Sequence, residues 1–380
     1  MPSPLTSCSS PTPPEGSVLT ARALNRALLA RQWLLERQDR SALEAVEHLV
    51  GLQAQDVKAP YYQLWARLND FDPQELSALL ESRAAVRIVL MRGTIHLVSA
   101  RDALLLRPVV QELIARATDA NWGRGVEGVD RAALASAGRV LVEEQPRTFA
   151  QLGALLAERW PDADPASLAQ QIRALVPLVQ VPPRALWGRS GAAAHTSAEH
   201  WLAGVGAPES SREDVVRRYL RAFGPASVAD AQKWSGLTRV AETVERLRGE
   251  LVSFFDQRGR ELLDVVDAPR PDPETEVPPR LAGPFDNLIL SHADARVLPV
   301  ELRRLVMTQN GLIAGMVLID GFVAGSWRVK ATKKLATLTF SSFSGKAYRK
   351  KDAPVLREEG DRLLRFAAPD APAREVVFSE

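Results

Sequence analysis

The chain passes from one predicted helix to the next in the stretch His48–Leu–Val–Gly–Leu–Gln–Ala–Gln–Asp–Val–Lys–Ala–Pro–Tyr–Tyr62. Gly51 is a typical helix terminator, and Pro60 fits the first turn of the helix that follows. Gln53 and Gln55 therefore lie in non-helical backbone, where side chains two residues apart point the same way. Their two amides can then meet at one point, whereas a helix would turn them about 200° apart. Gln-x-Gln also occurs by chance, and most surface glutamines only bind water, so the context decides its meaning.

Length and composition describe an ordinary globular protein. The chain has 380 residues, of which 46% are hydrophobic and 25% charged, and its formal net charge is +2. This length predicts about two to four domains. The single cysteine, Cys8, excludes an intrachain disulfide and fits a reducing compartment, and no apolar run approaches the roughly 18 residues of a membrane span. We therefore expect a cytoplasmic protein that does not enter a membrane.

The periodicity predicts the same order of elements three times: helices with apolar spacing, followed by a β-hairpin. Residues 1–18 precede them as an expected disordered tail, rich in Pro and Ser and without the features of a signal peptide. The three rounds occupy residues 19–118, 119–205 and 206–267. Their hairpins are predicted at Val86–Leu90 with Thr94–Val98, Leu178–Val181 with Ala185–Trp187, and Leu251–Phe255 with Glu261–Val265. One long helix, Ala100–Ala117, is expected after the first hairpin.

A different pattern follows. Residues 268–280 are rich in proline and acids and are expected to form an exposed linker. From residue 281 to residue 380 the apolar periodicity shifts to two, with short strands divided by Gly and Asp–Gly turns. One helix, Ala353–Phe366, and a last strand, Val376–Phe378, complete this part. The fold class is therefore α+β, with a C-terminal antiparallel β domain that suits a small sheet or barrel.

Three stretches, in this order, resemble the winged-helix DNA glycosylases of the AlkZ/YcaQ family. They are Leu52–Gln–Ala–Gln–Asp56, Met91–Val98, and Phe285–His292 with Gly315–Arg328 downstream. The resemblance runs from about Leu19 to the C-terminus. It implies three tandem winged-helix units in a C shape, held by a C-terminal β domain.

The resemblance also implies that Gln53 and Gln55 are the catalytic motif, in the Gln-x-Gln form of the AlkZ branch. The neighbouring Asp56 has no place in the family's scheme and is a further catalytic candidate.

The chemistry of two amides fits this activity. An amide is not a general base, but it can hold a water molecule in line with C1′ of a nucleotide. Such positioning suffices when the leaving base is already cationic, as an N7-alkylated guanine is, and amide carbonyls can stabilise the oxocarbenium-like sugar. We therefore expect a monofunctional DNA glycosylase for N7-alkylated purines. Its biological context, general repair, crosslink unhooking or self-resistance to a DNA-alkylating natural product, stays open.

Predicted DNA contacts lie in two places. The segment Ser326–Lys351 contains eight Lys and Arg and no acid, and Arg328, Lys330, Lys333 and Lys334 are predicted to bind phosphates. The alternative is an edge strand protected by lysines. In the first predicted wing, Arg92 and His96 are predicted to contact the backbone near the lesion; the alternative for His96 is a half-exposed strand histidine. Asp286, His292 and Trp327 are expected to serve the structure.

Other chemistries find little support. The five histidines are far apart in sequence and no cysteine accompanies them, so neither a metal site nor a cofactor is expected. The expected partner is double-stranded DNA with alkylated bases, bound by a monomer. Two alternatives remain: a non-enzymatic winged-helix DNA-binding regulator, and a scaffold that binds proteins through its β domain. Release of a base from alkylated DNA separates the first hypothesis from these two.

Overall fold

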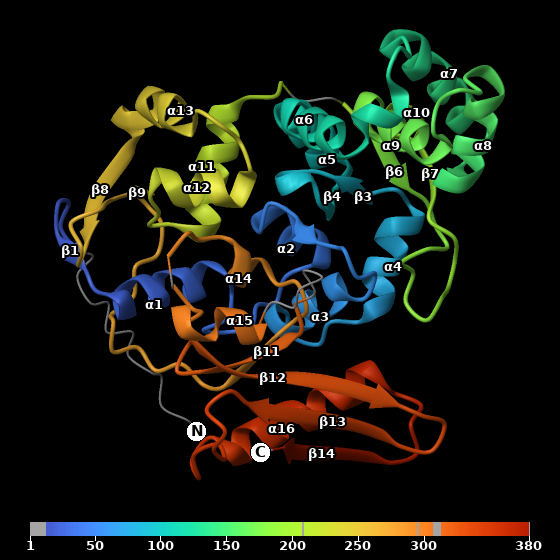
Figure 1. Cartoon of the computed structure of the whole chain (residues 1–380). Coiled ribbons are helices and arrows are strands. Elements are labelled where there is room, and N and C mark those ends of the chain that lie inside the picture. Colours follow the sequence, from blue (N-terminus) through green and yellow to red (C-terminus); the bar gives the residue numbers. More distant parts are fainter. Residues whose placement is uncertain (1–12, 207–208, 295, 307–312, 380) are drawn as a thin grey trace.

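The computed structural model describes residues 13–206, 209–294, 296–306 and 313–379. These residues form sixteen α-helices and three β-sheets, which confirms the α+β class. In Figure 1 most of the first helix-and-hairpin group lies in the centre, with its first helix at the lower left, and the second group lies at the upper right. The third lies on the left, and the C-terminal sheet lies below. Among the described residues, no helix combines the length and apolar character that crossing a bilayer requires.

The first group carries the glutamine loop. Its elements are α1 (Ala21–Arg31), α2 (Ala42–His48), β2 (Leu52–Gln53), α3 (Ala59–Arg67), α4 (Pro73–Glu81), β3 (Ala85–Val89), β4 (Ile95–Ser99), α5 (Ala100–Val109) and α6 (Gln111–Trp122). Side-chain caps begin the first two helices, since Thr20 accepts from the N–H of Ala23 and Ser41 forms a capping box with Glu44. The single helix expected over Ala100–Ala117 is wrong. Two helices, α5 and α6, meet at Val110, two residues after Pro108, which lies inside α5.

The second group has its own hydrophobic core, built around Leu134, Leu152 and Ile172. Its elements are α7 (Arg131–Glu144), β5 (Arg147–Thr148), α8 (Phe149–Arg159), α9 (Pro165–Leu175), β6 (Leu178–Gln180), β7 (Ala194–Ser197) and α10 (Ala198–Trp201). The strand expected at Ala185–Trp187 is wrong, because β7 takes that place in the hairpin. Ala185 and Trp187 instead lie in a loop against the first group: the hydroxyl of Tyr61 donates to the carbonyl of Ala185 at 2.7 Å.

The hairpins of the first two groups form one sheet. Its strand order is β2-β4-β3-β6-β7-β5. The junction is the antiparallel pair β3–β6, in which Arg87 lies opposite Gln180 and Ile88 opposite Val179. The second group is thus continuous, through hydrogen-bonded strands, with the strands beside the glutamine loop.

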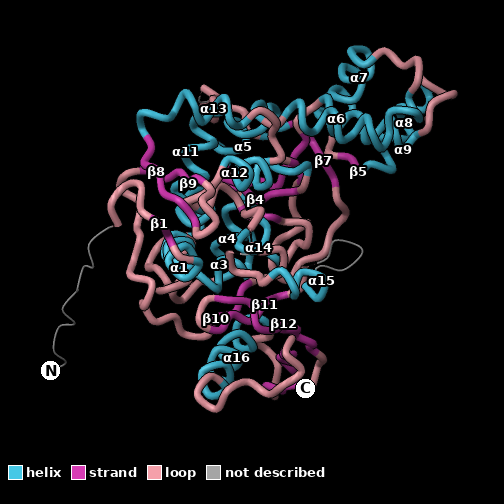
Figure 2. Tube along the Cα trace, turned by 60° about the vertical axis from the view of Figure 1, so that its left-hand side comes forward, coloured by secondary structure: helices cyan, strands magenta, loops and turns pink. Residues whose placement is uncertain are grey.

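The third group contains α11 (Arg212–Phe223), α12 (Val228–Ser235), α13 (Val240–Leu247), β8 (Leu251–Asp256) and β9 (Glu261–Val265). A third strand, β1 (Val18–Leu19), pairs in parallel with β8, as Figure 2 shows beside α1. The predicted tail therefore ends too late, because Val18 is already in a strand. Residues 1–12 of that tail lie outside the described residues.

The C-terminal part is not an antiparallel barrel. It contains β10 (Arg280–Ala282), α14 (Asn287–Leu290), α15 (Arg303–Val306), β11 (Gly315–Ile319), β12 (Phe322–Ala331), β13 (Ala336–Ser342), α16 (Ala353–Ala367) and β14 (Arg374–Ser379). The strand order β10-β11-β12-β13-β14 places β10 and β14 at opposite ends of an open sheet. β14 is parallel to β13 because α16 connects them, and a helical crossover returns the chain in the same direction.

Residues 268–280 are less exposed than expected for a linker. Val277 is buried, and the carbonyl of Thr275 accepts from Nε of Arg26 on α1 at 2.9 Å. The segment therefore lies against α1 as a strap. One core cluster runs through the first group, the third group and the C-terminal part, so these three are packed as one body.

Candidate active site

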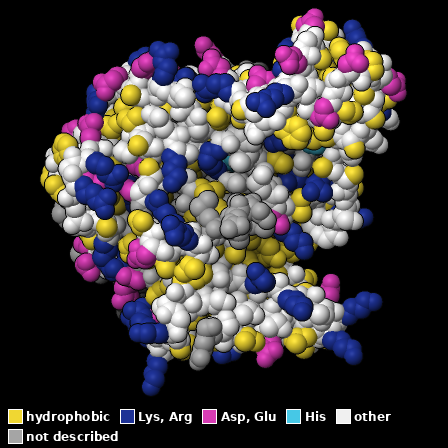
Figure 3. Space-filling model, viewed as in Figure 1, with side chains coloured by type: hydrophobic (Ala, Val, Ile, Leu, Met, Phe, Trp, Pro, Cys, Tyr) yellow, Lys and Arg dark blue, Asp and Glu magenta, His cyan; other side chains and the backbone are white. Residues whose placement is uncertain are grey.

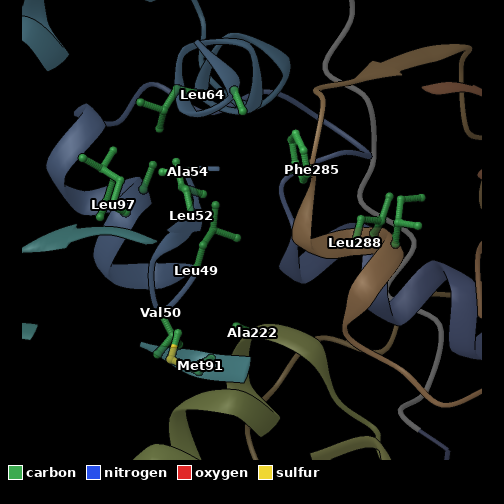
Figure 4. Close-up of a cluster of buried hydrophobic side chains, with 14 of the residues drawn as sticks. Leu49, Val50, Leu52, Ala54, Leu64, Met91, Leu97, Ala222, Phe285 and Leu288 are labelled. Atoms are coloured by element: carbon green, nitrogen blue, oxygen red, sulfur yellow. The ribbon is translucent and has the colours of Figure 1, made fainter. Parts of the chain in front are cut away.

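The glutamine loop is anchored by the residues on either side of Gln53. Leu52 and Ala54 are buried in the core cluster drawn in Figure 4, which also contains Leu97 of the neighbouring strand β4. Gln53 ends β2 opposite His96, and its side chain is 5% exposed. Gln55 lies two residues further on and is exposed. The loop thus presents one glutamine below the surface and one on it.

Both amides meet the same turn, the one between β3 and β4. Oε1 of Gln53 accepts a hydrogen bond from Nη2 of Arg92 at 2.7 Å. Oε1 of Gln55 accepts from the backbone N–H of Ile95 at 2.9 Å. A carbonyl oxygen has two lone pairs, so each amide keeps one acceptor position as well as its NH₂ donors. Both side chains therefore contact residues 92–95, and the meeting of the two amides at one point stays a prediction.

Arg92 joins this turn to the third group. Its backbone is left-handed, with φ 57°, and its Nη1 donates to the carbonyl of Trp234 at 2.5 Å. That carbonyl lies at the end of α12, where a cation interacts favourably with the helix dipole. Burial lowers the pKa of Arg92 to about 10, so the side chain is charged at neutral pH. Its guanidinium therefore positions Gln53, and a contact to DNA would have to use its remaining donors.

His96 does not fit its predicted DNA contact. Its side chain is 0% exposed, which also contradicts the half-exposed alternative. Nδ1 lies 3.0 Å from the carbonyl of Thr94 and must carry the hydrogen, while Nε2 has no partner among the described residues. Burial, and next the charge of Arg92, lower the pKa of His96 to about 3. The imidazole is neutral and lies beneath the site.

Asp56 has a local role at the end of the loop. Its Oδ1 accepts from the backbone N–H of Lys58 at 2.7 Å, just before α3 begins. This is the bond of an Asx turn, which orders the backbone between the second glutamine and the helix. The carboxylate is exposed.

The third motif of the sequence, Phe285–His292, forms a hydrogen bond to the backbone beside the glutamine loop. Nδ2 of Asn287 donates to the carbonyl of Gly51 at 2.7 Å. Nε2 of Gln63 donates to the carbonyl of Gln53 at 3.1 Å and to that of Pro284 at 3.0 Å. The three sequence motifs, distant along the chain, therefore meet around one loop.

The structural roles expected for three further residues are in agreement with their contacts. Asp286 forms a buried ion pair with Arg67, with two N–O distances of 2.8 Å. Nε1 of Trp327 donates to the carbonyl of Ala282 at 2.9 Å, and Nε2 of His292 lies 2.9 Å from the carbonyl of Phe223. His292 follows the short helix α14 rather than a strand.

Arg87 is the site residue that the sequence reasoning missed. It lies on β3 and is 2% exposed. Nη2 donates to the carbonyl of Ala54 at 2.6 Å, and Nη1 donates to Oε1 of Gln180 at 2.7 Å. The sequence signal that could have identified Arg87 is its position as a charged residue inside the apolar run Val86–Arg–Ile–Val89. A charge is rarely buried without hydrogen-bond partners, so such a position indicates specific contacts.

The predicted phosphate contacts lie at one end of the C-terminal sheet and are exposed: Arg328, Lys330, Lys333 and Lys334. Figure 3 shows Lys and Arg side chains projecting from the lower part of the molecule, where this sheet lies. Lys333 and Lys58 both line a cleft of about 860 Å³, which connects this end of the sheet with the segment that follows the glutamines. Among the described residues, Arg328–Ala331 pair only with β13, so the alternative of a lysine-protected edge stays open.

Comparison with known proteins decides the family. The family model described as DNA glycosylase AlkZ-like matches residues 46–366. The chain belongs to the AlkZ-like DNA glycosylase family. The resemblance seen in the sequence is thereby confirmed, and with it the assignment to a family of DNA glycosylases.

Two relatives agree with this membership. The chain is 28% identical over 166 residues to an interstrand DNA cross-link repair glycosylase of Streptomyces sahachiroi, an alignment that spans 40% of this chain and 44% of that relative. The solved structure of the Streptomyces sahachiroi DNA glycosylase AlkZ is similar to this chain with a TM-score of 0.76. That likeness has 19% sequence identity and covers 95% of this chain and all of the other, so it shows the fold.

A metal site is a separate question. In the part of the chain that the structure describes, no group of three or more His, Cys, Asp or Glu is arranged to hold a metal ion.

Proposed function

We propose that this family member is a monofunctional DNA glycosylase that hydrolyses the N-glycosidic bond of N7-alkylated purines in double-stranded DNA. The observation that carries the proposal is that the amides of Gln53 and Gln55 are fixed to one turn, with Gln55 at the surface. Both side chains are therefore held in place by hydrogen bonds, and the exposed amide of Gln55 is accessible to a nucleotide in bound DNA.

The reaction needs little beyond positioning. A water molecule held by the free lone pair of one amide attacks C1′, the C1′–N9 bond breaks, and its electron pair neutralises the cationic purine. The proton of the water passes to solvent, and the DNA keeps a hydroxyl at C1′, an intact abasic site. Because the leaving base becomes neutral, no acid has to protonate it. Arg92 polarises the carbonyl of Gln53 and so strengthens its NH₂ as a donor.

The larger arrangement of the chain is part of the same proposal. We take the three helix-and-hairpin groups, residues 19–118, 119–205 and 206–267, as winged-helix units that surround the DNA in a C shape. Residues 281–380 complete them as the C-terminal β domain. The exposed cations Arg328, Lys330, Lys333 and Lys334 would bind phosphates, and no base-specific contact is required.

Release of 7-methylguanine from methylated duplex DNA by the purified protein tests the activity. We expect free base and an abasic strand without a nick. A protein that shifts the duplex without releasing base would instead be the DNA-binding regulator.

The name of the curated relative supports a second substrate. Because that protein is described as an interstrand DNA cross-link repair glycosylase, we propose that this chain also acts on duplexes crosslinked through N7 of guanine. The exposed position of Gln55 favours it, since a crosslinked base cannot enter a deep pocket. Conversion of a crosslinked duplex to separable strands measures this activity, and crosslinks that persist while 7-methylguanine is released would restrict the enzyme to monoadducts.

A further inference from the structure

The peptide between the two glutamines is held from both sides. The N–H of Ala54 donates to the carbonyl of Ile95 on β4 at 2.8 Å. Its carbonyl accepts from Nη2 of Arg87 on β3 at 2.6 Å. Since Ala54 is the residue between Gln53 and Gln55, any movement of this peptide moves both catalytic candidates.

The other end of the same guanidinium is held by the second group. Nη1 of Arg87 donates to Oε1 of Gln180 on β6 at 2.7 Å, directly across the strand pair that joins the two groups. The guanidinium is planar, so its two bonds fix one another's direction. The position of the loop carbonyl thus depends on a side chain that lies more than a hundred residues away in the sequence.

Arg87 occupies a place where an apolar side chain would be expected. Its neighbours Val86 and Ile88 are apolar and buried, and burial lowers the pKa of Arg87 to about 10. A charge is expensive to bury, and its two hydrogen bonds here go to neutral oxygens. A hydrocarbon would fill the same space at no such penalty, so the guanidinium has a task that packing alone does not explain.

We propose that Arg87 and Gln180 are positioning residues that set the geometry of the Gln53–Gln55 pair, so that the second group completes an active site carried by the first. This inference rests on the proposed glycosylase function. Neither residue touches the reacting atoms; both act through the backbone of Ala54.

The test compares single-turnover base release by Gln180→Ala, Arg87→Lys and a matched control, Gln171→Ala. Gln171 is also a buried glutamine of the second group, and its Nε2 donates to Oδ1 of Asp119 at 2.9 Å. Among the described residues, this hydrogen bond does not involve the glutamine loop. We expect a rate about tenfold lower for Gln180→Ala and about a hundredfold lower for Arg87→Lys, whose point charge cannot span both acceptors. The Kd for DNA should stay within about threefold, and the control should keep the rate.

Two further measurements separate positioning from general damage. In a Gln55→Ala background, Gln180→Ala should lower the rate far less than it does alone, because its effect passes through the loop. Amide hydrogen exchange over residues 53–57 should speed up in Gln180→Ala and not in Gln171→Ala. Exchange reports the loop directly and decides the inference even if the wild-type protein releases no base. Unchanged exchange, or a rate loss that is fully additive with Gln55→Ala, would overturn it.

Discussion

Separate alanine replacements of Gln53 and Gln55 should differ in stability and agree in activity. Gln53 is 5% exposed and accepts from the charged Nη2 of Arg92, so Gln53→Ala leaves a half-buried guanidinium donor without its partner. Losing such a bond costs about 2–3 kcal/mol of the free energy of unfolding. Gln55 is exposed, and water can replace its bond to Ile95, so Gln55→Ala should cost about 0.5 kcal/mol. Each variant should lower single-turnover base release by about a hundredfold, because each loses one group that positions water.

A third variant, Gln53→Glu, separates the effect on stability from the effect on activity at position 53. Gln53→Glu keeps an oxygen acceptor for Arg92 but loses the NH₂ donor, so it should recover most of the stability and little of the rate. Urea titration followed by tryptophan fluorescence gives the free energies, and release of 7-methylguanine under enzyme excess gives the rates. Equal stability losses in Gln53→Ala and Gln55→Ala would contradict the Gln53–Arg92 contact. Full rates in both would show that the pair is not catalytic.

Four other results are expected. Neutralising Lys330, Lys333 and Lys334 together should lower the affinity for damaged and undamaged duplex DNA about equally. The slope of log K against log salt concentration should fall by roughly 0.9 for each phosphate contact that is lost. An unchanged slope would show that these lysines do not contact DNA. Borohydride should not trap the protein on DNA, and uracil should be a poor substrate, because the two neutral amides supply neither a Schiff-base amine nor an acid for a neutral leaving base. Lys58 is the only amine and Asp56 the only acid in the loop, so a trapped complex that is lost in Lys58→Ala would refute this. Asp286→Ala should destabilise the fold by about 3–5 kcal/mol in urea titrations, since it leaves buried Arg67 unpaired; a loss below 1 kcal/mol would contradict that pair. Burial lowers the pKa of His96 to about 3 and the pKa values of His195 and His292 to about 4. Between pH 7.5 and 5 the unfolded chain therefore binds protons that the folded chain does not, and the free energy of unfolding should fall by roughly 2 kcal/mol for each of these histidines. His195→Gln should remove one such contribution of about 2 kcal/mol, and an unchanged pH dependence would contradict this.

Local signals in the sequence were sufficient for the helices with clear ends. Asp130 and Asp164 accept from backbone N–H groups at the first turns of α7 and α9, and the helix expected over Ala353–Phe366 is present as α16 (Ala353–Ala367). Expectations failed where a distant partner decides the structure. Ala185 and Trp187 have strand-like composition, but Tyr61 and the first group bind their loop, and the hairpin closes later at β7. The parallel position of β14 likewise follows from the crossover of α16, which periodicity cannot reveal.

The site follows the same division. The non-helical backbone of Gln53 and Gln55 could be predicted from the helix signals Gly51 and Pro60 on either side of them. His96 was misjudged because strand alternation predicts one exposed face, whereas the strands around β4 are covered on both faces. Arg87 was missed for a related reason. A single arginine in a predicted strand is expected to be exposed unless the neighbouring strand that buries it is known. Its partner Gln180 is specified only by the β3–β6 register, which joins two groups that the sequence presents as separate repeats. The catalytic candidates Gln53 and Gln55 could thus be proposed from local spacing. Arg87 and Gln180, which hold their loop, are brought together only by pairing between distant segments.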